Sequence, residues 1–457
     1  MSYVPDPITR AAPRQLPLLV AGDPQRVLAW RDGRAVSAAQ FLAQVRAVAA
    51  ALPVAEAVVN LCVDRYAFMV AFCAAMLRAQ VTLLPSSRAP QAVDEVMATY
   101  AGCYALGEGV LDPAPRGYWQ LPTLDDVPVV DPALAWPQIP ADQVVAIGYT
   151  SGSTGVPHPS AKTWRSFHAS NAGNLSMLHA AVGDTFGVVA TVPPQHMYGV
   201  EMSVLLPLLG GHSVHTGRPF FPADVVAALA AIPAPRVLVS TPVHLRALVA
   251  SGVSLPPVAL IVSATAPLPL ALARAVEGAF GAPLREVFGS TETCVFASRQ
   301  PTVNEDWRVY ADVALHPQPD GTAVVAPQLN GAVTLADIVT LAADGRGFRL
   351  CGRRADLLEI AGKRASLGDL TRRLLAIPGV LDGVVLQLDD GDALGVQRIA
   401  ALAVAPELDA TTITEALRRS IDPVFLPRPL RLVTALPRNE TGKLPRSALL
   451  ALLKGPV

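Results

Sequence analysis

A run of hydroxyl-bearing and small residues follows a strongly apolar segment in VVAIGYTSGSTGVPHPSAKTW (144–164). Glycines let backbone N–H groups turn toward one point, and hydroxyls add further donors, which is the environment that phosphate oxygens require. The spacing is neither that of a Walker A loop nor that of a nucleophile elbow. The pattern predicts a phosphate-binding loop, with a flexible surface linker as the alternative. The candidate residues are Thr150, Ser151, Gly152, Ser153, Thr154 and Gly155.

The elements that must position this loop alternate between apolar strands and helices rich in Ala and Leu. AVVNLCV (57–63) predicts a buried strand, the next segment predicts a helix, and VTLLPS (81–86) predicts another strand. The same order returns over 186–194, 235–252 and 258–281. Because strand–helix–strand repeats with short turns produce parallel sheets, we expect an α/β fold with stacked, doubly wound sheets in a large N-terminal domain.

The composition changes in the turn-rich, basic segment DGRGFRLCGRRAD (344–356). A shorter helix and strand pattern follows, with helices expected over 367–377 and 413–421 and strands over 384–388 and 399–404. We therefore expect a large domain over 1–352 and a smaller α+β domain over 353–457.

Composition excludes several functional classes. The chain has 457 residues, and 36 Lys and Arg balance 37 Asp and Glu, which argues against a dedicated nucleic-acid binder. Four prolines interrupt the longest uncharged apolar stretch (247–273), so we expect no membrane-spanning helix, and the N-terminus does not resemble a signal peptide. The five cysteines form no CxxC pair, which argues against a zinc site or a disulfide framework. We expect a cytoplasmic protein.

Four segments, in order along the chain, resemble the motifs of one enzyme superfamily. TSGSTGVP resembles its phosphate-binding loop, EVFGSTET (286–293) its second motif, GFRLCGRRADLLEIAGKR (347–364) its hinge, and LPRNETGKLPR (436–446) its C-terminal motif. On these motifs the chain is identified as a member of the adenylate-forming superfamily, which contains acyl-CoA synthetases, nonribosomal-peptide adenylation domains and luciferases. The resemblance is weakest over the first 50 residues and over 300–335.

The resemblance implies a two-step reaction that uses ATP and Mg²⁺. A carboxylate attacks the α-phosphate of ATP, giving an acyl-adenylate and pyrophosphate. The thiol of CoA, or of a phosphopantetheine on a carrier protein, then displaces AMP. Both steps pass through charge-rich transition states, which preorganised donors and the metal would stabilise. The resemblance also implies that the small domain is mobile and rotates between the two steps.

The resemblance assigns ATP phosphates to the first two motifs. The loop residues would hold the β- and γ-phosphates, and Thr154 would join Glu292 at Mg²⁺, which prefers oxygen ligands. Thr291 would contact the α-phosphate. The family's usual Pro-Lys-Gly reads Pro-His-Pro at 157–159, so Lys162 either replaces the missing cation or is an ordinary surface lysine.

Residues from four segments would contact adenosine. Phe288 replaces the family's usual tyrosine and keeps a ring for stacking on adenine. Asp337 occupies the place of the ribose-binding aspartate, with an exposed loop aspartate as the alternative, and Arg353 matches an arginine that meets ribose or phosphate. Thr265 would rim both the adenine and the acid sites. The adenosine candidates are Ala264, Thr265, Phe288, Gly289, Asp337 and Arg353.

Two residues are expected to act on the reacting groups. Relatives place a lysine at Lys443 that reaches the carboxylate and the α-phosphate, because a point charge on a long stem can bridge both anions. His196, in PPQHMYGVE (193–201), matches a histidine that lines the acid pocket, and a packed histidine is the alternative. We expect the pocket between this segment and 263–268, with Met197, Tyr198 and Met202 as further candidates or as ordinary packing.

The chain is most like compact stand-alone ligases that load aryl acids, such as the pigment-pathway hydroxybenzoate–acyl carrier protein ligases of xanthomonads. The pocket segments hold no basic residue that calls for an amino acid or a second carboxylate. We therefore expect an aromatic acid such as a hydroxybenzoate. Since the sequence ends soon after Lys443, the phosphopantetheinylated acyl carrier protein is expected to be a separate partner.

Two alternatives stay open. One is a CoA ligase, which shares the first step and uses free CoA as acceptor. The other is a degenerate relative with a binding or regulatory role. Departures from the family pattern support the second alternative, and they are His158, Phe288, Ala355 and Glu359. Retained residues weigh against it, and they are Glu292, Asp337 and Lys443.

Overall fold

The computed structural model describes residues 14–125, 136–151, 157–319, 321–353, 357–360, 363–388, 398–439, 442 and 444–454. The chain forms two compact units, and each contains two separate stretches of sequence. The first unit holds Met1–Leu175 and Pro193–Arg218, and the second holds Ser176–Val192 and Pro219–Val457.

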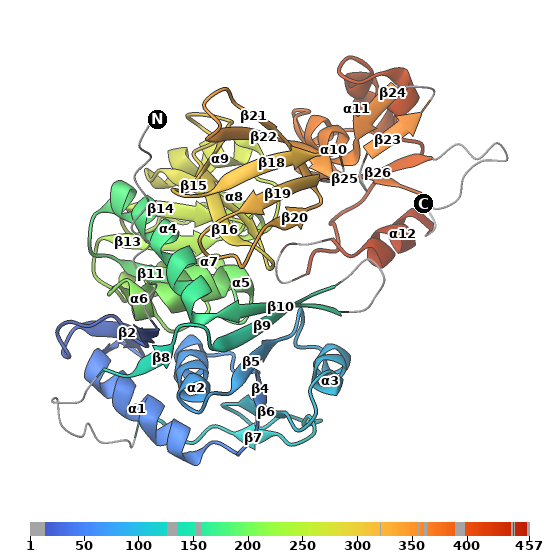
Figure 1. The fold of residues 1–457 in the computed structure, drawn as a ribbon. Helices are drawn as coiled ribbons and strands as arrows, with labels where there is room; N and C mark the ends of the chain where they lie inside the picture. Colours follow the sequence, from blue (N-terminus) through green and yellow to red (C-terminus); the bar gives the residue numbers. More distant parts are fainter. Residues whose placement is uncertain are drawn as a thin grey trace, which may run out of the picture. The chain divides into compact units, whose positions relative to one another are not determined.

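The first unit contains a mainly parallel sheet (Figure 1). In sheet order its strands are β10 (Pro157–Thr163), β9 (Val144–Ser151), β5 (Val81–Leu84), β4 (Ala57–Asn60), β6 (Tyr104–Gly107) and β7 (Trp119–Gln120). All neighbouring pairs are parallel except β9–β10. Helix α2 (Arg65–Leu77) contacts β4, β5 and β6, and α1 (Ala38–Ala51) packs on α2. Asp64 caps α2 by accepting a hydrogen bond from the Ala67 amide (2.8 Å), as expected at a helix start.

Smaller elements complete the first unit. β2 (Val27–Arg31) pairs with β3 (Arg34–Ser37) and with β12 (Ser213–His215), and β1 (Gln15–Pro17) pairs with β8 (Gln138–Pro140). The remaining helical elements are α3 (Pro90–Ala98), α4 (Trp164–Val182, which ends in the second unit), α5 (Met197–Gly199), the π-helix Val200–Leu205 and α6 (Leu206–Leu209).

The second unit is built on parallel strands that an antiparallel set extends. The parallel strands are β11 (Gly187–Ala190), β13 (Arg236–Ser240), β14 (Leu260–Ser263) and β15 (Leu284–Ser290). β16 (Cys294–Arg299), β17 (Trp307–Val309), β22 (Gly347–Arg353) and β21 (Asp337–Leu341) continue the sheet antiparallel. Helices α7 (Pro222–Ala230), α8 (Pro242–Ser251) and α9 (Leu270–Phe280) connect or follow the parallel strands. A separate sheet holds β18 (Ala314–Gln318), β19 (Gly321–Val325) and β20 (Val333–Leu335).

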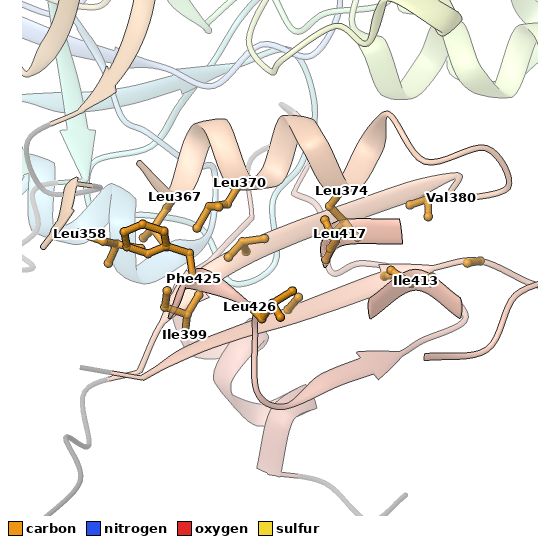
Figure 2. Close-up of a cluster of buried hydrophobic side chains, with 14 residues drawn as sticks. Leu358, Leu367, Leu370, Leu374, Val380, Ile399, Ile413, Leu417, Phe425 and Leu426 are labelled. Carbon is orange, nitrogen blue, oxygen red and sulfur yellow. The ribbon is translucent and has the colours of Figure 1, made fainter. Parts of the chain in front are cut away.

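The C-terminal part of the second unit has its own sheets and core. β23 (Leu357–Ile360) pairs with β24 (Lys363–Ser366), and β26 (Ile399–Val404) lies between β25 (Asp382–Gln387) and β27 (Leu430–Leu432). Side chains alternate along β26, so Ile399, Ala401 and Ala403 face one core cluster, and Ala400 and Leu402 face another. The first cluster includes residues of α10 (Leu367–Leu375) and α11 (Ala410–Arg418), as Figure 2 shows. The second includes residues of α12 (Arg446–Lys454).

The fold expected from the sequence is confirmed: the protein is α/β, with a large N-terminal part and a smaller C-terminal part. Both clusters around β26 contain only residues from Leu358 onward. The domain boundary expected at 352/353 stays a proposal. Among the described residues, no helix combines the length and the apolar character needed to cross a bilayer.

Candidate functional site

The segment predicted to bind phosphate begins inside a β-hairpin. Thr150 and Ser151 are the last two residues of β9 and pair with His158 and Pro157 of β10. Antiparallel pairing with β10 therefore prolongs the strand into the segment expected as a loop, and the contact of both residues with phosphate stays a prediction. Gly152, Ser153, Thr154 and Gly155 lie outside the described residues, so their contact with phosphate stays a prediction.

Lys162 is a buried residue of β10. It pairs with Ala146 in the hairpin, and only 3% of its surface is exposed. A solvated surface lysine is therefore excluded. Burial of an ammonium group is costly unless an anion or several acceptors offset the lost hydration, which keeps Lys162 a candidate for the cation missing at 158.

Thr291 and Glu292 lie in the tight turn between β15 and β16. Thr293, which is fully buried, fixes this turn: its Oγ1 accepts a hydrogen bond from the Ser290 amide (3.1 Å) and donates one to the Cys294 carbonyl (2.9 Å). The Ser290 hydroxyl accepts from the Thr293 amide (3.2 Å). Thr291 and Glu292 stay partly exposed at the tip. The turn thus presents a hydroxyl and a carboxylate on a rigid support.

Gly289 shapes the same hairpin. A Cβ at this position would lie 2.2 Å from the Cys294 carbonyl oxygen, and the strand register shifts between Phe288 and Gly289. Only glycine permits this approach. Cys294 itself has φ +59°, in the left-handed region that side chains disfavour. The motif glycine is therefore needed for the turn, whatever it contacts in a nucleotide complex.

Phe288 belongs to an aromatic cluster. Its ring centroid lies 5.2 Å from that of Trp307, 5.4 Å from that of Phe296 and 6.0 Å from that of Phe348. The Arg299 guanidinium lies over the Trp307 ring at 4.5 Å and pairs with the buried Glu286. The cluster holds one side of Phe288 in place, which is the support that a ring stacking on adenine would need.

Asp337 and Arg353 are brought together by a hairpin. They are direct register partners of β21 and β22, although 16 positions separate them in the sequence. The Thr322 hydroxyl donates to the Asp337 carbonyl (2.7 Å) and fixes the start of β21. The assignment of both residues to one ribose site stays a prediction. The contacts of the Arg353 side chain lie outside what the structure describes.

Ala264 and Thr265 directly follow β14, at the carboxyl ends of the parallel strands, where ligands of open α/β sheets bind. Thr265 has φ +81°, which is an outlier for a β-branched residue. Such strain persists where the surrounding structure enforces it, and it concentrates at functional sites. Ser263, at the end of β14, is fully buried, and its hydroxyl has no hydrogen-bond partner among the described residues.

A polar network at the ends of β11 and β13 was missed by the sequence reasoning. The Thr191 hydroxyl lies 3.1 Å from the Ser240 hydroxyl and 3.1 Å from His244 Nδ1, which lies 3.0 Å from the Thr241 hydroxyl. Phe220 packs edge-on against the His244 ring (5.6 Å). A signal was present, because Ser or Thr ends three successive apolar runs, GVVAT, RVLVS and LIVS.

The C-terminal motif meets the strand ends at Gly442. This residue has φ +80°, and a Cβ on it would lie 3.4 Å from Val243 Cγ2, 3.8 Å from Ala266 Cβ and 3.9 Å from Thr265 Oγ1. The backbone at Gly442 therefore lies close to residues 265–266, in a segment that the sequence analysis assigned to the same site. Lys443 follows Gly442 and lies outside the described residues, so its own position stays a prediction.

The segment of His196 belongs to the first unit. His196 is partly buried, Met197 and Tyr198 are buried, and Met202 is fully buried in the π-helix, an element that often marks functional sites. The predicted pocket joining these residues to 263–268 involves both units and stays a prediction.

Buried polar contacts behind the His196 segment hold it in place. The guanidinium of Arg65, fully buried on α2, donates to the Ser203 hydroxyl, which donates to the Gly199 carbonyl (2.6 Å). Burial lowers the pKa of Arg65 to about 9. A Cβ on Gly199 would lie 1.9 Å from the Pro193 carbonyl oxygen, so the chain turns back on itself at this point.

The hinge motif contains a second close approach. Gly352 has φ +118°, and a Cβ there would lie 2.7 Å from the Ser366 hydroxyl, which caps α10 by accepting from the Asp369 amide (3.0 Å). Ala355 lies outside the described residues, and only the backbone of Glu359, in β23, is described.

The donor set around Glu292 fits a magnesium ion that shares its ligands with a nucleotide. In the described part of the chain, no three His, Cys, Asp or Glu side chains gather into a metal cluster. Mg²⁺ commonly takes one or two carboxylates and completes its shell with phosphate oxygens and waters. One partly exposed carboxylate on a rigid turn suits that mode of binding better than a site made by protein alone.

Comparison with known proteins gives a consistent result. Residues 19–324 match the family model described as AMP-binding enzyme. A 4-coumarate–CoA ligase from Halorhodospira halophila is 32% identical over 308 residues, which cover 65% of this chain and 73% of the relative. A 3-hydroxybenzoate–CoA/4-hydroxybenzoate–CoA ligase from Thauera aromatica is 24% identical over 361 residues, 69% of this chain and 68% of the relative.

Solved structures share the fold. The o-succinylbenzoate coenzyme A synthetase of Bacillus subtilis, in complex with AMP, superposes with a TM-score of 0.79 over 95% of this chain and 98% of its own, at 18% identity. The same synthetase in complex with ATP and a magnesium ion gives a TM-score of 0.77 over 93% and 96% of the two chains, at 17% identity. At these identities the likeness establishes the architecture alone.

Proposed function

Because the chain belongs to the AMP-binding enzyme family, we propose that it activates an aromatic carboxylic acid with ATP and transfers the acyl group to the phosphopantetheine thiol of an acyl carrier protein. The family and its acid–thiol ligase chemistry are the premise. The aromatic acid and the carrier protein are the proposal.

The reaction would proceed in two displacements. A carboxylate oxygen forms a bond to the α-phosphorus while the bond to the bridging oxygen of pyrophosphate breaks. The thiol sulfur then bonds to the acyl carbon, the bond to AMP breaks, and the thiol proton is released. When bound beside Glu292, Mg²⁺ would supply positive charge to the phosphate oxygens. Lys443 would neutralise the carboxylate and the α-phosphate as they approach.

The closeness of the Gly442 backbone to Thr265 supports this proposal most directly. Lys443 is the next residue after Gly442, and Thr265 is the strained residue at the rim assigned to adenine and acid. The lysine stem is long enough to extend from this point toward the carboxyl ends of the parallel strands. Two segments far apart in the sequence thus support one site for adenylation.

Polar groups near the strand ends favour an acid with a hydroxyl on its ring. A site built to hydrogen-bond a hydroxyl rejects analogues that lack it, because buried polar groups are then left unpaired. Thr265 is a candidate partner at these strand ends, and the network of Thr191 and His244 adds a further one. Tyr198 and His196 stay candidates from the sequence. The relatives named for coumarate and hydroxybenzoate support the aromatic class.

The acceptor has a second candidate. The relatives described above are named as CoA ligases, which favours free CoA as the thiol. Both acceptors present the same phosphopantetheine arm, so the first step and its residues are the same in either case. A regulatory relative without catalysis remains the third possibility that an experiment must exclude.

Pyrophosphate exchange tests the first step without knowledge of the acceptor. We expect ATP–pyrophosphate exchange with 4-hydroxybenzoate or 3-hydroxybenzoate to exceed exchange with benzoate, 4-coumarate, octanoate and an α-amino acid. The best acid is then supplied with either CoA or a phosphopantetheinylated carrier protein, and the acylated product is identified by mass spectrometry. Exchange with no acid of the panel would overturn the enzymatic proposal, and faster acylation of CoA would replace the carrier protein.

A further inference from the structure

A charged cluster links α8 to the segment that precedes Lys443. Its centre is Asp382, the first residue of β25, which is 8% exposed. Arg438 binds this carboxylate with two hydrogen bonds, from Nη2 to Oδ1 (2.7 Å) and from Nε to Oδ2 (2.9 Å). Arg246 of α8 approaches Oδ2 of the same carboxylate at 3.7 Å.

Arg438 connects Asp382 to Gly442. Its remaining nitrogen, Nη1, donates to the Gly442 carbonyl (2.7 Å), and the Gly442 amide donates to the Asn439 carbonyl (2.8 Å). The backbone directly before Lys443 is therefore fixed by a guanidinium that is itself fixed by Asp382. A bidentate pair of this kind is both strong and specific in orientation.

Helix α8 provides the other side of the contact. Val243, which lies beside Gly442, and Arg246 are three positions apart and so share one face of the helix. The two links differ in strength. Arg438 makes two short bonds, whereas Arg246 makes one long ion pair and is repelled by Arg438. Burial lowers the pKa of the Arg246 guanidinium, the Asp382 charge opposes this, and Arg438 adds to the lowering. The Arg246 link is therefore the one that can break.

We propose that Asp382, Arg438 and Arg246 position the Lys443 segment for adenylation, with the Arg246–Asp382 contact as the releasable link. Asp382 and Arg438 would fix the backbone at Gly442, and Arg246 would hold it against α8 while the adenylate forms. The link would open before thiol transfer. This inference rests on the proposed function and adds positioning residues that contact neither substrate.

The test separates the two half-reactions. In Arg246→Met, we expect ATP–pyrophosphate exchange with 4-hydroxybenzoate to fall about tenfold, the change that about 1.4 kcal/mol makes in an equilibrium. Thiol transfer from synthetic 4-hydroxybenzoyl-adenylate, to whichever thiol the wild type accepts, should be unchanged or faster. Arg246→Lys keeps the charge and should restore part of the exchange. Arg274→Met, which removes an exposed arginine from α9, is the matched control and should behave as the wild type.

Asp382→Asn is a second test of the same cluster. It weakens both links, so exchange should fall further than in Arg246→Met. Because this change also affects a buried pair, its melting temperature must be compared with that of the wild type. Equal losses in both half-reactions of Arg246→Met, or no loss in either, would overturn the inference. Failure of the proposed function looks different, because the wild type itself would then show no exchange.

Discussion

The β15–β16 hairpin and the segment around Gly442 carry the two groups expected to act on ATP, and they are held in opposite ways. In the hairpin, Ser290 and Thr293 bond across three positions, and Glu286 pairs with Arg299 across 13 positions. Around Gly442, Arg438 depends on Asp382, 56 positions earlier, and on an ion pair from α8.

This difference indicates which part of the site can change its conformation. Bonds inside a hairpin form with the hairpin and are lost only when it unfolds. Contacts between distant elements contribute stability only while those elements are packed. They can therefore break and re-form during a conformational change that leaves each element folded. We infer that the Glu292 side of the site is fixed and the Lys443 side is adjustable. The following changes test this contrast, from the largest expected effect to the smallest.

Lys443→Ala tests whether the adjustable side provides the reactive charge. We expect pyrophosphate exchange to fall about 10³-fold, at the upper end of the effect of removing one donor to a transition-state charge. ATP binding, measured by calorimetry, should change little because the β15–β16 turn is untouched. Full exchange activity in this variant would remove Lys443 from the reaction.

Arg299→Met removes the internal pair of the fixed side. It leaves the Glu286 carboxylate buried without its partner, and we expect the free energy of unfolding at pH 7 to drop by about 3 kcal/mol, measured by urea denaturation. Burial raises the pKa of Glu286, and Arg299 opposes this. Since a raised folded pKa favours the protonated fold at low pH, the deficit of the variant should shrink between pH 7 and pH 5. A deficit independent of pH would show that Arg299 acts by packing on Trp307 alone.

Thr293→Val tests the turn itself. The valine keeps the shape but leaves the Ser290 amide without its acceptor, so the free energy of unfolding should fall by about 1–3 kcal/mol, and exchange should fall with it. Thr334→Val on the exposed face of β20 is the matched control, and its urea midpoint should match that of the wild type. Equal behaviour of the two variants would mean that the turn is held by other bonds.

Asp369→Asn tests exposed ion pairs within one helix, where we expect the smallest effect. Asp369 pairs with Arg372 and Arg373 on α10. Burial raises the pKa of Asp369, but hydrogen bonds and charges from Arg373 and Arg372 outweigh it and hold the pKa below its usual value. The exposed pair should contribute about 0.5 kcal/mol at pH 7. A lowered folded pKa gives stability that is lost as the pH falls toward and below the unfolded value near 3.9, so variant and wild type should converge there. A persistent difference in acid would point to lost packing.

Much of the architecture was readable because its signals are local. Apolar runs followed by helical stretches gave β4–α2–β5, β13–α8 and β14–α9 close to their observed bounds. The motif around Glu292 was also local, and it does form a turn.

The features that the sequence did not predict depend on contacts between residues far apart in the chain. No spacing rule connects Asp382 with Arg438 or Arg246, since each lies in a different element. The strand β10 was missed because Pro157, His158 and Pro159 are poor strand formers, and its pairing with β9 overrides that preference. Residues 300–335 have little resemblance to the family, so the sheet of β18, β19 and β20 had no signal beyond short apolar runs.

One cysteine offers a practical consequence. Of the five thiols, only Cys351 is exposed; Cys103 is half-buried, and Cys62, Cys73 and Cys294 are buried. It stands one residue before Gly352, beside the proposed domain boundary. A thiol-reactive fluorophore would therefore attach there without engineered sites, and its emission would give a real-time optical record of how the C-terminal part moves during turnover.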